Sequence, residues 1–319
     1  MTRVDEETQL FVEKSRELRE EFSNLIISFR EDLWNYCRYL TGSAWDGEDL
    51  FQETLLKAYG GFYQVWQPEN PKSYLYRVAT NTWIDHCRRE KRIVGSLEDI
   101  DEPSEAFVDN LELEFALEHL VNHFTPRQVS VFLLVHVFKF KADEVASIVK
   151  TTRGAIYSTI RRMEKRLSKL DLNTNPVLDE TTANTLTESQ KEVIQKYIQA
   201  MNDGNLEGVF SLLSDHLHHE ASLGFQEFSK EAIRKGSMQH GLPPYRAEEH
   251  CLWGRFVILK IVDSENGPLI HDIQYQDVEN DKIVYHRSYY FRKEFIVAAA
   301  IELGMTPELD KFPIDWDKK

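Results

Sequence analysis

The stretch from Asp46 to Arg92 constrains the fold of this chain more than any other segment. Apolar residues recur every three or four positions over 46–59 and again over 71–92, which predicts two amphipathic helices. Between them, a segment over 62–73 is rich in aromatic residues and contains two prolines. We therefore expect a helical domain in which two helices and an aromatic loop share one outer surface.

The first of these helices has an acidic and polar face opposite its apolar stripe. Asp49, Gln52 and Glu53 lie three and four residues apart, so they share that face. On an isolated helix such a face would simply be solvated. Here the helix is followed by a loop and a second helix with their own candidate binding groups, which favours a role in binding a partner.

The loop and the second helix combine aromatic, amide and basic side chains. Aromatic residues beside cations form stacking surfaces for unpaired bases, each stack contributing ~1–3 kcal/mol, and clustered Arg and Lys side chains bind phosphates. Asp85 is expected to orient an arginine rather than to touch nucleic acid. We also expect at least one loop aromatic to anchor the loop to the helices. The candidate nucleic-acid ligands are Phe62, Tyr63, Trp66, Tyr74, Arg77, Asn81, Arg88 and Arg89.

The formal net charge is −15, which disfavours indiscriminate binding to nucleic acid. The distribution is uneven, however. Residues 72–92 contain six basic and two acidic side chains, and residues 139–169 contain nine basic and three acidic ones. Between these two basic segments, residues 93–118 carry nine acidic residues and no Lys or Arg. Charges farther apart than ~8 Å are largely screened, so each basic segment can still bind phosphates locally.

A second helical region follows the acidic segment. Thr125 and Gln128 form a capping box with Pro126 at the first helical position. Helices are then predicted over 141–149 and 153–170, with a three-residue turn between them, which is the pattern of a helix-turn-helix. The residues on the outer face of its second helix that could contact the major groove or its phosphates are Arg153, Tyr157, Ser158, Arg161, Arg162 and Lys165.

The last part of the chain has a different pattern of apolar residues. A polar linker precedes a capping box at Thr187, and two helices are predicted before the apolar period changes from helical to alternating. Strands are expected over 256–262, 269–278 and 283–291, followed by a helix over 293–303. This pattern predicts a separate α+β domain.

The length and composition of the chain argue against several other classes of protein. A chain of 319 residues is too long for one ordinary core, and no apolar run reaches the length of a membrane span. The N-terminus has no apolar signal segment. The three widely separated cysteines are expected to be reduced thiols in a cytoplasmic protein that makes no membrane contact. No metal site, cofactor or catalytic residue is predicted, and His119 and His123 lack the glutamate of a zinc-protease motif.

Two segments resemble a known family when they are taken together. DGEDLFQETLLKAY followed by NPKSYLYRVATNTWIDHCRR resembles region 2 of the extracytoplasmic-function (ECF) sigma factors of bacterial RNA polymerase. FTPRQVSVFLL followed by ADEVASIVKTTRGAIYSTIRR resembles their region 4. More weakly, residues 187–304 resemble the SnoaL-like, or NTF2-like, cone domain that is fused to a subset of these factors.

The resemblance implies partners for the candidate residues. Asp49, Gln52 and Glu53 would bind the RNA polymerase core, and the aromatic loop with the helix after it would bind the promoter −10 element as single strand. The second helix of the helix-turn-helix would bind the −35 element. Tyr157 and Thr159 stand where family members often have basic residues, and Lys150 replaces the usual glycine of the turn, which leaves the −35 sequence preference open.

The expected fold class is multidomain, with two all-α domains followed by an α+β SnoaL-like cone. The cone would contact the sigma regions within the same chain and regulate them. The expected segments are 10–95 for region 2, 96–110 for an acidic linker, 111–172 for region 4, 173–186 for a second linker, 187–304 for the cone and 305–319 for a tail.

Two alternatives remain open. A helix-turn-helix transcriptional regulator that does not bind core polymerase would have no reason to carry the Asp49–Glu53 face. The C-terminal domain could instead be an enzyme, with acid–base groups from His219, Glu220, His271, Asp272 and Asp277. Because no nucleophile or cofactor loop accompanies them, we expect these five to be structural and the protein not to be an enzyme.

Overall fold

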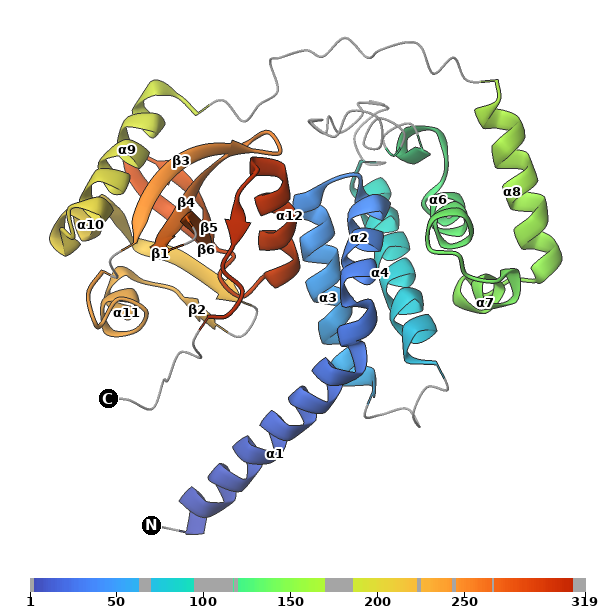
Figure 1. Ribbon diagram of the computed structural model, residues 1–319, viewed down its shortest axis with the longest axis horizontal. Coiled ribbons are helices and arrows are strands. Elements are labelled where there is room, and N and C mark those ends of the chain that lie inside the picture. The colour runs from blue at the N-terminus through green and yellow to red at the C-terminus, as the bar shows by residue number, and fades with distance from the viewer. Residues whose placement is uncertain are drawn as a thin grey trace. The chain divides into compact units, whose positions relative to one another are not determined.

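The computed structural model forms two compact units, residues 1–177 and 178–319. It describes residues 3–62, 70–94, 117, 120–169, 186–222, 225–242, 245–265 and 267–311. The first unit consists of helices, and the second combines helices with a sheet (Figure 1). Within the described residues, no helix is both long enough and apolar enough to cross a membrane.

The first unit begins with a set of long helices. α1 (Arg3–Ile26) leads through a 3₁₀ turn (Ile27–Phe29) into α2 (Arg30–Thr41). α3 (Ala44–Phe62) and α4 (Pro71–Val94) are the two helices predicted from the central stretch. The helix predicted over 46–59 is longer in the structure, because α3 continues through Gly60 and Gly61 to Phe62.

α2, α3 and α4 pack around a shared apolar core. Leu33, Leu40, Phe51 and Leu75 are fully or almost fully buried. Gly47 permits the closest approach, since a Cβ atom there would lie 2.5 Å from the Arg38 Cα on α2. The tight packing of α2 against α3 fixes the direction in which the polar face of α3 points.

Four shorter elements form the helix-turn-helix part of the same unit. α6 (Pro126–Phe132) starts with the predicted capping box at Thr125 and continues into a π-helical turn, η2 (Leu133–Val137). α7 (Ala142–Ile148) and α8 (Arg153–Leu167) follow, close to their predicted bounds. Ile156, Ile160 and Met163 are buried on the inner face of α8.

An aromatic cluster joins the two helical parts. Phe138, directly after η2, makes edge contacts with Tyr36 of α2 and Tyr76 of α4, at ring-centroid distances of 5.3 and 5.6 Å. Phe140 lies 4.8 Å from the Tyr76 ring. The Tyr36 hydroxyl shares a 2.8 Å hydrogen bond with Thr80 Oγ1 of α4. We call Tyr36, Tyr76, Phe138 and Phe140 the aromatic clasp.

The second unit combines helices with a curled sheet (Figure 1). α9 (Glu188–Asn202) begins at the predicted Thr187 capping box, and α10 (Leu206–Leu212) follows. The strands are β1 (Leu213–Ser222), β2 (Phe225–Glu227), β3 (Arg246–Leu252), β4 (Arg255–Ser264), β5 (Gly267–Glu279), β6 (Lys282–Ser288) and β7 (Thr306–Pro307). α11 (Lys230–Lys235) precedes β3, and α12 (Lys293–Leu303) follows β6.

The strand order in the part of the sheet that is described is β2-β1-β6-β5-β4-β3, with β7 also paired to β5. β1 and β6 run parallel, whereas β6, β5, β4 and β3 form antiparallel neighbours. Asn280 and Asp281, with φ of 49° and 58°, form a tight turn between β5 and β6. This is the α+β cone that the sequence predicts.

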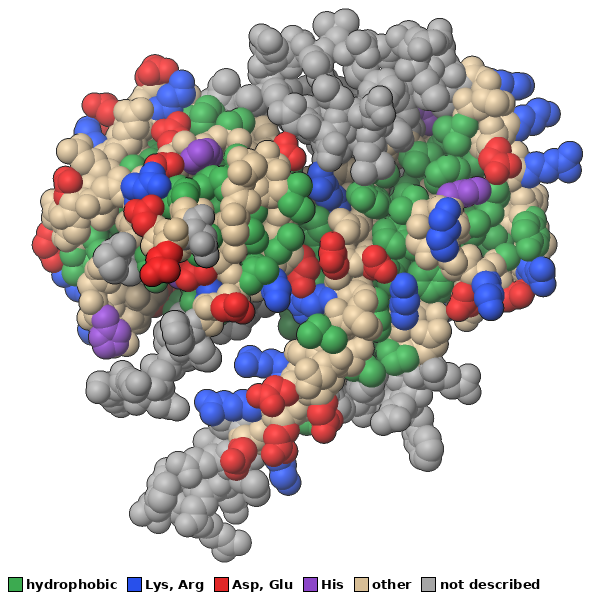
Figure 2. Space-filling view, viewed as in Figure 1, with side chains coloured by type: hydrophobic (Ala, Val, Ile, Leu, Met, Phe, Trp, Pro, Cys, Tyr) green, Lys and Arg blue, Asp and Glu red, His purple; other side chains and the backbone are tan. Residues whose placement is uncertain are grey.

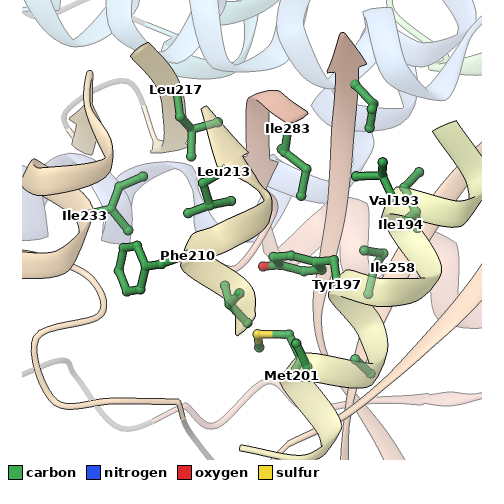
Figure 3. Packing of buried hydrophobic residues seen from close by; sticks show 14 residues of the cluster. Val193, Ile194, Tyr197, Met201, Phe210, Leu213, Leu217, Ile233, Ile258 and Ile283 are labelled. Carbon is green, nitrogen blue, oxygen red and sulfur yellow. The ribbon is translucent and has the colours of Figure 1, made fainter. Parts of the chain in front are cut away.

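One face of the sheet is covered by α9, α10 and α11. Tyr197 and Met201 of α9, Phe210 of α10 and Ile233 of α11 pack against Leu213 and the neighbouring strand residues (Figure 3). The strands β1, β2, β3 and β7 were not predicted, and the predicted strand over 283–291 ends earlier, at Ser288. β1 is polar in composition, but its Leu213 and Leu217 belong to the same buried cluster as Phe210 of α10 and Ile233 of α11.

Candidate nucleic-acid interface

The polar face of α3 lies where the sequence predicts it, but its residues are not equivalent. Asp49 is exposed, whereas Gln52 and Glu53 are half-buried. The Gln52 amide donates a 2.7 Å hydrogen bond to Glu48 Oε1, and Glu48 is itself buried and accepts from Trp34 Nε1. Glu48 therefore fixes the orientation of Gln52, a role that the sequence did not reveal.

Glu53 links α3 to α4. Its carboxylate lies 2.8 Å from Lys57 Nζ on one side and 2.8 Å from His86 Nε2 on the other. Partial burial by itself raises the pKa of Glu53, but hydrogen bonds from Lys57 and His86 outweigh this and hold the pKa below its usual value. Glu53 is thus a charged group with fixed geometry, and Asp49 is the more accessible carboxylate of the two.

α4 carries the predicted polar row on its outer face. The Arg77 guanidinium stacks over the Tyr74 ring at 5.5 Å, and Tyr74 Oη lies against Gly61, where a Cβ atom would come within 2.5 Å of it. Asn81 is exposed and extends the same face. The Tyr74 ring is therefore positioned from both sides, by α3 and by a cation on its own helix.

The basic end of α4 is exposed. Arg88 Nη1 lies 3.4 Å from Asp85 Oδ1, and Arg89 Nε donates a 3.3 Å hydrogen bond to the Asp85 carbonyl. Asp85 thus orients both arginines, as the sequence predicts. Of the three loop aromatics, the side chain of Phe62 and the whole of Tyr63 and Trp66 lie outside the described residues.

The turn before α8 is stabilised by a single arginine. Arg127 Nη2 donates to the carbonyl oxygens of Val149 and Lys150, at 2.7 and 3.3 Å. Lys150 has a φ of 52°, the left-handed conformation that usually favours glycine. Thr152 then caps α8 by accepting a 3.3 Å hydrogen bond from the Ala155 amide. The geometry of the turn is preserved although its usual glycine is absent.

The outer face of α8 brings the predicted groups together. Arg153 stacks over Tyr157 at 5.6 Å and lies 3.4 Å from Asp143, while Tyr157 itself is 53% exposed. Figure 2 shows Lys and Arg side chains standing out from the surface over α8. The exposed residues of this face are Arg153, Tyr157, Ser158, Arg161, Arg162 and Lys165. A row of cations spaced along an exposed helix is suited to contacts with phosphates.

The five C-terminal acid–base candidates are not assembled into one site. His219 pairs with Glu227 at 3.1 Å, and Asp272 accepts hydrogen bonds from Ser288 and Gln274. Three residues have separate surroundings: His271 pairs with Glu308, Glu220 lies 3.2 Å from Tyr285 Oη, and Asp277 accepts from Tyr275.

Comparison with known proteins agrees with the helical geometry. Residues 25–93 match the model of the family "Sigma-70 region 2". Over 231 residues the chain is 28% identical to the ECF RNA polymerase sigma factor SigG of Mycobacterium tuberculosis, covering 63% of this chain and 61% of SigG. Over 157 residues it is 25% identical to RNA polymerase sigma factor SigV of Bacillus subtilis, covering 46% of this chain and 92% of SigV.

Solved structures show weaker overall similarity. The ECF sigma factor SigJ of Mycobacterium tuberculosis aligns with 84% of this chain and 95% of its own, at 17% identity and a TM-score of 0.33. An NTF-2 like protein from Burkholderia xenovorans aligns with 41% of this chain and 94% of its own, at 12% identity and a TM-score of 0.27.

The matched region 2 is the part that contains α2, α3 and α4, with the acidic face and the polar row described above. Residues 25–93 are similar to region 2 of the sigma-70 family, and the two relatives compared above are RNA polymerase sigma factors, of which SigG is an ECF sigma factor. The resemblance predicted from the sequence is confirmed. The matched segment spans 61% of the length of SigG, so the activity of the whole protein is addressed below as a proposal.

Proposed function

We propose that this protein binds the core of bacterial RNA polymerase and directs it to specific promoters, from a cytoplasmic location. The observation that carries the proposal is the region 2 match over residues 25–93, combined with an exposed acidic face on α3 and a separate basic face on α4. A regulator that only binds DNA needs the second face and has no use for the first.

The proposed roles follow the two faces. Asp49, Gln52 and Glu53 bind core polymerase, with Gln52 and Glu53 held in place by Glu48 and His86. The Tyr74–Arg89 row of α4 binds the −10 element as single strand, with help from the loop that contains Trp66. The exposed face of α8 binds the −35 element in the major groove.

A reconstitution assay tests the proposal. The protein, core polymerase and a library of genomic promoter fragments are combined, and transcript starts are mapped. We expect starts at a small set of promoters and none when the protein is omitted. An Asp49→Lys variant should lose core binding, whereas Glu20→Lys, at an exposed position on α1, should not. Failure of the wild-type protein to bind core polymerase would refute the proposal and favour the simple helix-turn-helix regulator.

The aromatic clasp indicates that the protein changes conformation when it binds polymerase and promoter. Elements centred about 10 and 35 base pairs upstream of a start site lie ~85 Å apart along B-form DNA, at ~3.4 Å per base pair. Tyr36 and Tyr76 contact Phe138 directly, so the two helical parts are packed against each other in this structure. We infer that the clasp opens when the protein binds polymerase and promoter.

The cone and tail are proposed to regulate the sigma regions from within the same chain. The acidic character of the chain is consistent with a domain that covers basic faces, and 305–319 is the segment proposed to mediate the effect. Deleting the chain from Thr306 onward should change transcription without unfolding the helical unit. A deletion protein that transcribes like the intact chain would exclude regulation through the tail.

A further inference from the structure

Arg153 occupies the first position of α8, the helix that is proposed to enter the major groove. Side chains on an α-helix lean toward its N-terminus, so the side chain of Arg153 extends toward and past that end of the helix. In helix-turn-helix proteins, the N-terminal residues of the second helix contact the edges of bases. Arg153 is therefore placed for a base contact when α8 lies in the groove.

Two neighbours fix the orientation of the Arg153 guanidinium. Its Nη1 donates a 3.4 Å hydrogen bond to Asp143 Oδ2 of α7. Its Nη2 donates a 3.3 Å hydrogen bond to Tyr157 Oη, one helical turn further along α8, and its Cζ lies 5.6 Å from the centroid of the Tyr157 ring. A long side chain that is held before binding loses less conformational entropy when it binds. The guanidinium is thus oriented before any DNA is present.

The turn between α7 and α8 keeps Asp143 and Arg153 at a constant separation. Arg127 donates hydrogen bonds to the carbonyl oxygens of Val149 and Lys150, at 2.7 and 3.3 Å. These bonds hold the end of α7 next to the start of α8. The orientation of Arg153 therefore depends on both helices of the helix-turn-helix and not on α8 alone.

The carboxylate of Asp143 determines which part of DNA suits Arg153. The two side chains together carry no net charge, and a carboxylate repels a phosphate, so the pair is poorly suited to a phosphate contact. The edge of a guanine is uncharged and offers the acceptors O6 and N7, which match the donor geometry of a guanidinium. Arg162, in contrast, makes its 3.2 Å hydrogen bond to an uncharged group, the carbonyl of Ser158.

We propose that Arg153 recognises a guanine in the −35 element and that Asp143 and Tyr157 are positioning residues that orient it. The inference rests on the proposed binding of α8 to promoter DNA. Tyr157 stands where related factors often carry a basic residue. In this chain the hydroxyl at that position holds Arg153, so the position contributes to sequence preference through Arg153.

A selection experiment with the holoenzyme tests the base contact. A promoter found in the reconstitution assay is randomised over its −35 element, and the fragments that the full-length protein and core polymerase bind are sequenced. Wild type should enrich a guanine at one position. Arg153→Ala should reduce that preference by about tenfold and leave the other positions unchanged. Lys165→Ala, which removes an exposed cation of the same face, should weaken binding to all sequences equally.

The positioning residues are tested in the same selection. Asp143→Asn and Tyr157→Phe each remove a group that accepts a hydrogen bond from Arg153, so each should lower the guanine preference by about two- to tenfold. Glu164→Gln is the matched control for charge, because Glu164 is an exposed carboxylate on α8. Like Asp143→Asn, it should raise affinity for all sequences, but it should leave the guanine preference unchanged.

Three results would overturn the inference. Wild type could select a −35 sequence without a guanine, or Arg153→Ala could weaken binding with unchanged base preferences. Arg153→Ala could also reduce the slope of log K against log salt concentration by ~1, as the loss of a phosphate contact does. A full guanine preference in both Asp143→Asn and Tyr157→Phe would refute the positioning role. Failure of the wild-type protein to bind core polymerase would refute the proposed function itself.

Discussion

His86 Nε2 on α4 lies 2.8 Å from Glu53 Oε2 on α3, and this contact joins the two helices that carry the candidate interfaces. Glu53 belongs to the acidic face, while His86 lies between Asn81 and the basic end of α4. This contact therefore connects a carboxylate of the acidic face on α3 to the helix that carries the polar row.

The Glu53–His86 contact predicts a pH dependence of stability. The pKa of Glu53 is lower in the folded protein than in the unfolded chain, so its contribution is present above the unfolded pKa of about 4.3 and is lost as pH falls through the folded value. Glu53→Gln should remove part of the acid-induced loss in the free energy of unfolding. Because Glu53 and Lys57 are partly exposed, we expect the Glu53→Gln substitution to change this acid-induced loss in the free energy of unfolding by less than about 1 kcal/mol.

Urea denaturation of the intact protein between pH 3 and pH 7 measures this effect, with the pH values set by the unfolded pKa of about 4.3. Glu90→Gln is the matched control, since Glu90 is an exposed carboxylate on α4. It should leave the pH profile unchanged. If Glu53→Gln has the same profile as wild type, the contacts with Lys57 and His86 do not stabilise the fold.

The aromatic clasp predicts a gain of function. Phe138→Ala removes the ring that contacts both Tyr36 and Tyr76. Each aromatic pair contributes about 0.5–1.5 kcal/mol, so losing the cluster should favour the open arrangement by about 1 kcal/mol, or roughly fivefold. We expect transcription by the reconstituted holoenzyme to rise accordingly when the protein is limiting.

Phe132→Ala provides the control for the clasp. The Phe132 ring lies 4.6 Å from that of His136, centroid to centroid, within the helix-turn-helix part itself. It should therefore lower the stability of that part without raising transcription. A Phe138→Ala protein with unchanged or reduced transcription, but with normal thermal stability, would show that the clasp does not restrain the sigma regions.

The sequence predicts the helices well because their ends carry local signals. Thr125 and Thr187 accept hydrogen bonds from the backbone of the third following residue, and both capping boxes are present in the structure. The face of α8 follows from its apolar period alone. The positions of Asp49 and Arg161 on exposed helix faces therefore follow from the spacing of apolar residues along each helix.

Contacts between residues far apart in the chain could not be predicted from the sequence. β1 was missed because its buried positions include His219 beside Leu217 and Ala221, and a buried histidine does not look apolar in a sequence. The clasp was missed for a related reason. Phe138 and Tyr36 are far apart in the chain, and nothing in their local patterns shows that they meet.

The turn before α8 gives a stability prediction. Lys150 adopts a φ of 52°, which is strained for a residue with a Cβ atom. Lys150→Gly should stabilise the protein by about 1 kcal/mol, less the entropy that glycine adds to the unfolded chain. Lys150→Ala keeps the strain and removes the charge, so it serves as the control. If both variants change the free energy of unfolding equally, the effect comes from charge and not from φ.

The exposed face of α8 predicts a specific salt dependence of DNA binding. Each phosphate contact contributes ~0.9 to the slope of log K against log salt concentration. Arg161 is exposed on this face, whereas the Arg166 guanidinium stacks over Phe124 at 5.3 Å. In promoter binding by the holoenzyme, measured over a range of salt concentrations, Arg161→Ala should reduce the slope by ~1 and Arg166→Ala should leave it unchanged. Equal slopes for wild type and Arg161→Ala would show that Arg161 makes no phosphate contact.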